Sequence, residues 1–383
     1  MKKGLLLSVV ATGIIFAGGD IAPVAPVVAP QPTVAPAACD FWGTLAARYD
    51  AKKDGKYNLG KKANNFFATA IAMGVEKEVG YGFGFGAEFG AYTDLGLDIA
   101  GSVNGTHSEL SQLYLTYKNG NTAIKAGRQA LPKSLSPWAW SDRTAGVLDR
   151  TYEGVVLVNT DIQDTTLVAA WVSRYADGDK SVRVNGDTNK GIYMIAMQNK
   201  SLANTTITTS IYYAPSPLKA TSAWLAVEGK ASSVDLGLQL AYAKIKGLGL
   251  KKTLGVAAYA GGSFNGLDAR LTLAYIDDGK TPLSLGTTSA FWGNSFAGAF
   301  GGDTLGAKQK IARVDLGYKI PGYGKVYGGV GVDKVTGGKT MVGGRIGYDF
   351  KIKDVNAKVE YRYHKDNNSV KNHRIRVQGV YKF

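Results

Sequence analysis

Apolar and polar residues alternate one by one along most of this chain from residue 40 onward. In the segment 41–50 the odd positions are mostly apolar, whereas the even positions include Arg48 and other polar residues. Because successive strand side chains point to opposite faces, this period predicts strands with one apolar and one polar face. About eighteen such segments can be counted, and those around 190–199 and 218–230 have the weakest pattern. The clearest repeats lie at 81–94, 268–277, 310–320, 357–364 and 373–383.

The connections between these segments alternate between long and short. Long stretches such as 51–64, 95–108 and 130–152 are each followed by a short turn, for example "KNGN" at 118–121. An up-and-down sheet that crosses a membrane has this asymmetry, with short turns at one mouth and long loops at the other. Lipid offers no partner for backbone groups, so such a sheet must close on itself, with apolar side chains outward. We therefore predict an all-β fold over 40–383, a transmembrane antiparallel up-and-down β-barrel of about eighteen strands.

The number of strands sets the width of the lumen. Eighteen strands about 4.8 Å apart, tilted by about 40°, give a circumference of about 113 Å and a backbone radius of about 18 Å. Side chains of the wall are too short to fill that space, so we expect a water-filled lumen. A soluble β-sandwich with one buried face is the alternative, but it gives no reason for connections that alternate in length.

The N-terminal residues are typical of a secreted protein. Two lysines precede the apolar run 4–16 and several small residues, which is the pattern of a signal peptide over 1–19. A short membrane anchor is the alternative, although the run is too short to span a bilayer. Residues 20–39 hold five of the 11 prolines, so a Pro-, Ala- and Val-rich linker is expected there. Cys39 is the only cysteine, which excludes an intrachain disulfide.

The parity of the strands assigns a set of arginines to the lumen. The chain has a formal net charge of +15, and removing the two lysines of the signal peptide leaves +13. A positive wall lowers the barrier for anions and raises it for cations, which predicts an anion-leaning pore. Each arginine taken singly can equally serve to pair with a carboxylate on the wall. The predicted basic ladder of the lumen consists of Arg48, Arg174, Arg270, Arg313, Arg345, Arg362, Arg374 and Arg376.

The loop 130–152 is the most apolar of the long connections. It contains Trp138 and Trp140, and two tryptophans exposed at a surface tip would be costly. We therefore predict that this third extracellular loop folds inward against the wall and narrows the lumen, with a flat extracellular lid as the alternative. Four charged residues of the loop would then face the solute, namely Asp142, Arg143, Asp149 and Arg150.

The segment 121–162 resembles the fifth strand, third loop and sixth strand of OprD-like outer-membrane porins. In that family "GRQ" ends the strand, as at 127–129, and "EG" with alternating apolar residues begins the next, as at 153–154. The whole layout is also similar to major outer-membrane porins. The resemblance implies monomeric or trimeric channels for small hydrophilic solutes, with a constriction at the third loop. The constriction residues expected on these grounds are Arg128, Trp138, Asp142, Arg143, Asp149 and Arg150.

The chain ends on Phe383, at an outward position of the last predicted strand. A terminal phenylalanine of this kind resembles the assembly signal that bacterial outer-membrane assembly machinery reads. The expected location is therefore the cell outer membrane of a Gram-negative bacterium. The partners implied are outer-membrane lipid and lipopolysaccharide, small solutes and ions, that machinery and a homotrimer, but no nucleic acid.

Motifs for other chemistry are weak. "DKVTGGKT" at 333–340 is similar to a phosphate-binding loop, but it connects two predicted strands and so indicates a hairpin. The three histidines lie far apart, so we expect no metal and no cofactor, and His107 beside Ser108 is the one weak hint of a hydrolase. We interpret the chain as a porin and not an enzyme. The alternatives are an OprD-like channel that prefers small carboxylates or amino acids, a surface adhesin and a barrel hydrolase.

Overall fold

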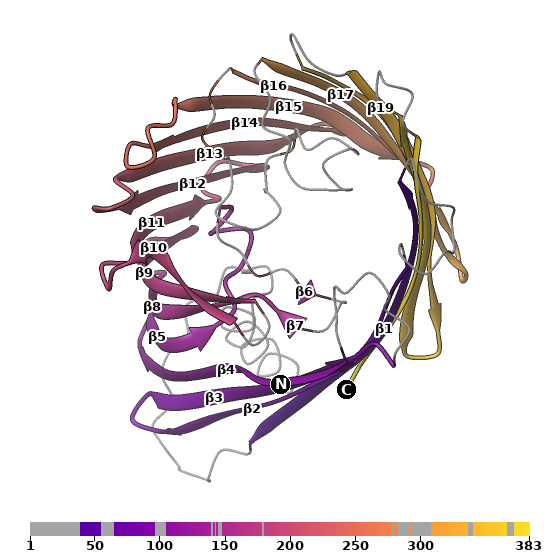
Figure 1. Ribbon diagram of the computed structural model, residues 1–383. Coiled ribbons are helices and arrows are strands. Elements are labelled where there is room, and N and C mark those ends of the chain that lie inside the picture. The colour runs from indigo at the N-terminus through magenta and orange to yellow at the C-terminus, as the bar shows by residue number, and fades with distance from the viewer. Residues whose placement is uncertain are drawn as a thin grey trace.

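Long β-strands stand side by side in a ring in the computed structural model of this protein (Figure 1). The structure describes residues 39–54, 65–95, 105–138, 141, 143–144, 148–177, 180–277, 279, 281, 292, 308–335, 340–365 and 371–383. The strands are β1 (Asp40–Asp54), β2 (Asn65–Gly80), β3 (Phe83–Thr93), β4 (Thr106–Asn119), β5 (Thr122–Gln129), β6 (Arg143–Thr144), β7 (Leu148–Asp149), β8 (Thr151–Asn159), β9 (Thr165–Asp177), β10 (Lys180–Asp187), β11 (Ile192–Asn199), β12 (Thr205–Ala214), β13 (Ala220–Ala231), β14 (Val234–Ile245), β15 (Thr253–Phe264), β16 (Leu267–Ile276), β17 (Gln309–Ile320), β18 (Gly324–Val335), β19 (Thr340–Ile352), β20 (Val355–Lys365) and β21 (Lys371–Lys382).

Every neighbouring pair of wall strands is antiparallel, and the ring closes where β21 pairs with β1, with Thr44 opposite Lys382. Among the described residues, eighteen strands form this wall, namely β1–β5, β8, β9 and β11–β21. The predicted antiparallel barrel of about eighteen strands is therefore confirmed. The nineteenth strand of the sheet, β10, pairs only with the end of β9. The two weakly patterned segments are also wall strands, β11 and β13.

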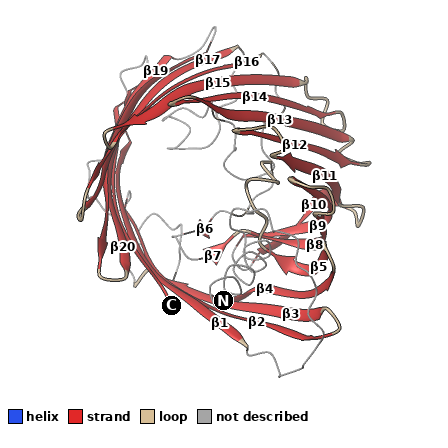
Figure 2. Ribbon diagram, turned by 180° about the vertical axis from the view of Figure 1, so that it is seen from behind, coloured by secondary structure: helices blue, strands red, loops and turns tan. Residues whose placement is uncertain are grey.

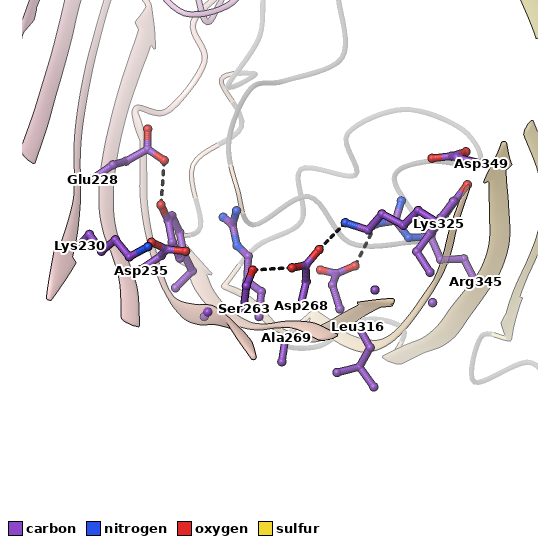
Figure 3. Close-up of a pocket in the computed structure, with 18 of the residues that line it drawn as sticks. Glu228, Lys230, Asp235, Ser263, Asp268, Ala269, Leu316, Lys325, Arg345 and Asp349 are labelled. Atoms are coloured by element: carbon purple, nitrogen blue, oxygen red, sulfur yellow. Dashed lines mark hydrogen bonds and ion pairs between the residues drawn. The ribbon is translucent and has the colours of Figure 1, made fainter. Parts of the chain in front are cut away.

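Apolar side chains cover the outside of the ring, as the alternation predicted. On β16 the side chains of Leu271 and Leu273 are exposed, whereas Thr272 between them is fully buried. Figure 3 shows the same division at close range, because Leu316 points away from the cavity into which Asp268 and Arg345 project. An exterior of this kind suits a hydrocarbon environment, while the polar positions face the centre.

Short turns connect neighbouring strands at one mouth of the ring. Asn265 and Gly266 join β15 to β16, and both have a positive φ, 48° and 83°. Two consecutive residues of this conformation form the tight turn whose twist matches that of the flanking strands. At the other mouth the connections are longer, for example residues 130–150 between β5 and β8 and residues 277–308 between β16 and β17. The predicted asymmetry between the two mouths is confirmed.

Seen from behind, the ring is built of strands and connecting segments (Figure 2). No helix in the described part of the chain is long and apolar enough to cross a membrane. The strands β18 and β19 pair as an antiparallel hairpin, so the segment 333–340 connects two strands as predicted and lacks the helix that a phosphate-binding loop precedes. Of this segment, residues 336–339 lie outside the described residues.

Candidate functional site

The third loop folds inward, against the inner surface of the wall. Leu131, Leu135 and Trp138 are buried in one apolar cluster with inner side chains of β8, β9 and β11–β14. The rings of Trp138 and Trp224 meet edge to face with centroids 6.2 Å apart. Burial of these large side chains holds the loop on one side of the lumen. The predicted inward fold of the loop is therefore confirmed for this segment.

Trp138 was expected at the constriction of the lumen, but in the structure it is buried between the loop and the wall. Its side chain is 0% exposed, so it packs between the loop and the wall and presents no surface to a solute. Next to it, the hydroxyls of Ser136 and Tyr212 are 3.2 Å apart and share a hydrogen bond. Trp138 therefore anchors the loop to the wall and does not itself line the lumen.

Four of the five other residues expected at the constriction belong to the described part of the chain. Arg128 on β5 donates from Nη2 to Glu109 Oε2 at 3.0 Å, and from Nε to Thr151 Oγ1 at 2.9 Å. The guanidinium of Arg150 lies 5.7 Å from the centroid of the Tyr175 ring. The backbones of Arg143 and Asp149 pair in the small β6–β7 ribbon, which lies inside the ring (Figure 1). Asp142 lies outside the described residues.

Seven of the eight ladder arginines lie on one continuous part of the wall, on β16, β17, β19, β20, β21 and β1. Arg174 is the exception. It lies on β9, on the side of the loop, with Nη1 3.8 Å from Glu153 Oε2. Strand parity indicated correctly that it faces inward, but it could not indicate where around the ring β9 would stand.

Six of these arginines share only three carboxylates. Asp50 binds Arg48 and Arg376, with N–O distances of 2.5 Å and 2.8 Å, and also Arg374. Asp315 binds Arg313 at 2.7 Å and Arg345 at 2.9 Å, while Glu360 binds Arg362 at 2.5 Å. Three positive charges are therefore left in excess among these nine residues, although each arginine has a carboxylate partner. The residues that meet in these clusters are Arg48, Asp50, Arg313, Asp315, Arg345, Glu360, Arg362, Arg374 and Arg376.

The strand register also places cations directly opposite one another. Arg345 lies opposite Arg362, Arg362 opposite Arg374, and Arg374 opposite Lys52. Like charges at such positions are unfavourable for the stability of a sheet. A row of four adjacent cations is therefore difficult to explain by stability alone. Lys52 is a member that the sequence did not single out.

Arg270 differs from the other ladder arginines. Its guanidinium carbon lies 3.6 Å from the centroid of the Tyr259 ring and 5.7 Å from that of Trp292. Among the described residues, no carboxylate lies within ion-pair distance of it, and its Nε is buried without a hydrogen-bond partner. Aromatic rings hold the plane of this guanidinium by cation–π contact, and no carboxylate of the described residues forms an ion pair with it.

Two tyrosines that face the lumen, Tyr259 and Tyr327, lie on the same part of the wall. The sequence analysis did not identify them. Tyr259 lies across Gly237, its partner on β14, and donates to Glu228 Oε1 at 2.9 Å. Tyr327 lies in the same way across Gly347 and donates to Glu360 at 3.0 Å. A side chain at either glycine would collide with the ring. The available signal was a tyrosine on the polar face of a strand that faces a glycine, but the facing residue depends on the register.

A cavity of about 780 Å³ opens along this part of the wall (Figure 3). Its charged side chains are balanced in number, six acidic and six basic. Lys325 Nζ lies 2.5 Å from Asp268 Oδ2, and Lys358 Nζ lies 3.6 Å from Asp349 Oδ1. The lining of this cavity is therefore more balanced than the predicted excess of basic residues in the lumen, and the excess charge lies toward β19–β21 and β1. The charged residues are Glu228, Lys230, Asp235, Asp268, Arg270, Asp315, Lys325, Arg345, Asp349, Lys358, Glu360 and Arg362.

Other chemistry has little support in the described residues. No group of three or more His, Cys, Asp or Glu side chains there could hold a metal ion. The ring of His107 stacks on that of Tyr92 with centroids 5.1 Å apart. Ser108, the next residue on the same strand, points to the opposite face. This arrangement offers no serine–histidine pair for a hydrolase.

Comparison with solved structures identifies the fold. The outer membrane protein OpdK from Pseudomonas aeruginosa superposes with a TM-score of 0.71 at 14% identity, covering 90% of this chain and 99% of that one. A structure of OpdK with vanillate gives 0.73 at 12% identity, covering 90% and 98%. OccAB3 from Acinetobacter baumannii gives 0.70 at 12% identity, covering 90% and 100%. The barrel fold expected from the resemblance is therefore confirmed over most of the chain.

Two further comparisons found nothing similar. No family model matches this chain, and no curated protein matches it.

Proposed function

We propose that this protein is an outer-membrane porin that lets small hydrophilic solutes and ions diffuse passively through its lumen. The observation that carries the proposal is the closed eighteen-strand ring with an apolar exterior and a charged interior. A ring of this size cannot be filled by its own side chains, so water occupies the space that the third loop leaves open. An enzyme or an adhesin needs no such lined passage.

An anion-leaning pore is the second part of the proposal. It is supported by the six guanidinium groups that share three carboxylates, and by the row from Arg345 to Lys52. In a confined aqueous space the excess positive charge concentrates anions and repels cations. Salt screens this field, so the preference is strongest at low ionic strength.

The constriction is proposed to lie between the third loop and the basic wall. Support comes from the buried anchor at Trp138 and from the ribbon β6–β7, which stands inside the ring. On the side of the loop, solutes would pass Arg128 at the end of β5 and Arg150 just before β8. The proposed constriction set is Arg128, Trp138, Asp142, Arg143, Asp149 and Arg150, with Trp138 acting as the anchor.

A preference for small carboxylates is a second candidate function, which Arg270 favours. Among the described residues it has no ion-pair partner and its Nε has no acceptor, and Tyr259 holds the guanidinium in place. An arginine fixed in this way can bind a carboxylate through two parallel hydrogen bonds. The similar protein OpdK has been crystallised with vanillate, a carboxylate. Amino acids, which also carry a carboxylate, fit the balanced cavity as well.

Export and assembly complete the proposal. Residues 1–19 are proposed to be a signal peptide and 20–39 a linker to the barrel. Phe383 is proposed to act as the assembly signal. Its backbone N–H and C=O both pair with Gly43 across the closing strands, at 3.0 Å and 2.7 Å. Its ring stacks on that of Tyr381 with centroids 5.7 Å apart, so the terminal aromatic pair stands at the point where the barrel closes.

Recordings from purified protein in planar lipid bilayers test the channel directly. Stepwise single-channel currents are expected, and a bilayer that stays silent with folded protein would contradict the porin. A salt gradient across the same bilayer then tests the charge argument through the reversal potential. Anion preference is expected, whereas a clear cation preference would show that acidic residues control the lumen.

A further inference from the structure

The outer surface of the ring carries a group of lysines at one mouth. Lys310, Lys334, Lys365 and Lys371, called here the rim lysines, are exposed and belong to the outward-facing sets of β17, β18, β20 and β21. Each lies within two residues of a strand end at the mouth that carries the long connections, and Lys310 directly follows the connection 277–308. Lys53, the outward residue next to the end of β1, continues the same rim.

The rim lysines occur as facing pairs. Lys310 lies opposite Lys334, and Lys365 lies opposite Lys371. Lysines in such positions repel each other and destabilise the pairing of the strands. Among the described residues, none of the four has a carboxylate within ion-pair distance. The nearby Asp277 accepts hydrogen bonds from the backbone N–H groups of Leu254 and Gly279, both at 3.0 Å.

Aromatic side chains mark the depth at which these lysines stand. Tyr363 precedes Lys365 by two residues on the outer face of β20, and His373 follows Lys371 by two on β21. The rings of Tyr363 and His373 are 5.1 Å apart, and Tyr361 shares a hydrogen bond of 2.7 Å with His373 Nδ1. Such rings are typical of the boundary between hydrocarbon and headgroups. The lysines lie just beyond that boundary, at the level of the headgroups.

The same strands have no such charge at their other ends. Their outward residues near the short turns are apolar or aromatic, namely Tyr318 on β17, Val326 on β18, Val355 on β20 and Tyr381 on β21. On these four strands the outward-facing positive charge is therefore confined to the mouth with the long loops, which is the extracellular mouth of an outer-membrane barrel. A membrane whose two leaflets differ in charge gives a reason for this difference.

We infer that the rim lysines form a binding site for the phosphate groups of a phosphorylated glycolipid of the outer leaflet. Each facing pair presents two ammonium groups side by side, and one phosphate between them removes their mutual repulsion. The acyl chains then lie along the apolar outer face below. The inference rests on the proposed location in the outer membrane, and it assigns a lipid to a surface that the pore does not use.

Native mass spectrometry of the full-length protein in detergent, titrated with bisphosphorylated lipid A, tests the site. The test variant combines K310Q, K334Q, K365Q and K371Q. The control variant combines K118Q, K200Q, K351Q and K353Q, which remove the same charge at the short-turn mouth. We expect binding to weaken by at least about tenfold in the test variant and to stay at the wild-type level in the control.

Two further measurements separate the ligand chemistry and the folding. Lipid A without phosphates is expected to bind the wild type as weakly as bisphosphorylated lipid A binds the test variant, and excess inorganic phosphate is expected to compete poorly. Single-channel conductance in phospholipid bilayers is expected to be equal in wild type and variants, which shows that the variants fold. Should the quadruple variant fail to fold, the pairs K310Q/K334Q and K365Q/K371Q are measured separately.

Equal lipid A binding by wild type and test variant, or equal loss in both variants, would overturn the site. Strong competition by inorganic phosphate would also overturn it, because the ligand would then be a free anion. A wild type that binds lipid A but stays silent in bilayers would refute the pore and leave the lipid site standing.

Discussion

Arg376 Nε donates a 2.8 Å hydrogen bond to Asp50 Oδ1, which joins the last strand of the ring to the first across 326 residues. Arg48 and Arg374 bind the other carboxylate oxygen, and Asp50 is only 1% exposed. The place where the barrel closes therefore combines backbone pairing with a buried cluster of one acid and three arginines. The same cluster belongs to the lumen wall, so closure and electrostatics depend on one residue.

Replacing Asp50 separates its contribution to barrel closure from its contribution to the charge of the lumen. Asp50→Asn leaves three guanidinium groups without their shared negative charge, and we expect a loss of about 3 kcal/mol in the free energy of unfolding. Anion preference is expected to rise, because one negative charge leaves the lumen. Urea unfolding in lipid vesicles and the reversal potential in a salt gradient measure the two effects.

Asp235→Asn is the matched control for this change. Asp235 lines the cavity, but no ion pair joins it to an arginine in the described residues. It should change the reversal potential in the same direction with little effect on unfolding. Equal stability of both variants would show that the Asp50 cluster does not hold the closing strands together.

Arg270 gives a prediction about solute binding. Arg270→Gln removes the one ladder guanidinium that has no carboxylate partner among the described residues, so binding of benzoate in the lumen should weaken about tenfold. Block of single-channel current by benzoate measures this affinity. Gly237→Ala should produce part of the same loss, because its methyl group displaces the Tyr259 ring on which Arg270 lies.

The control for Arg270 is Arg174→Gln, which removes the same charge on the side of the loop. If both variants lose benzoate affinity equally, the total charge of the lumen decides binding and Arg270 has no special role. Unchanged affinity in Arg270→Gln would exclude this residue as the carboxylate site while leaving the channel intact.

The anchor of the third loop can be tested through conductance. Trp138→Ala removes a fully buried ring from the contact with Trp224, at an expected cost of about 3 kcal/mol or more in the unfolding free energy. Once released from the wall, the loop should narrow the lumen less consistently, giving larger and noisier currents. Ile195→Ala, which shortens an exposed outward side chain, is the control and should conduct as the wild type does. A Trp138→Ala channel with unchanged conductance would speak against the loop as the constriction.

The proposed role of the C-terminal residue, Phe383, in assembly can be tested by deleting it. Deleting Phe383 removes two backbone hydrogen bonds to Gly43 and the ring that stacks on Tyr381. The amount of folded protein in the outer-membrane fraction of cells should fall sharply, as cell fractionation can show. Phe264→Ala removes another exposed aromatic residue at the same mouth and should leave that amount unchanged. If both variants reach the membrane equally, Phe383 is not the assembly signal.

The local alternation of apolar and polar residues determined more of the fold than of the chemistry of the lumen. The alternation at 268–277 already assigned Leu271 outward and Arg270 inward, because the period of two acts within a strand whatever its partners are. The two tryptophans of the third loop likewise indicated that it folds inward, since their burial is a property of composition.

The partners of each charge had to come from the closed ring. Asp50 meets Arg376 only because β21 pairs with β1 in one register, and a shift of one residue would turn Arg376 to the lipid side. The tyrosines laid across glycines depend in the same way on the registers of β14–β15 and β18–β19, and the full burial of Trp138 depends on how the loop packs against the wall. Sequence alone therefore determined strands, faces and closure, which follow from local side-chain alternation. The tertiary structure decided which arginines are neutralised, because that depends on contacts between strands far apart in the chain.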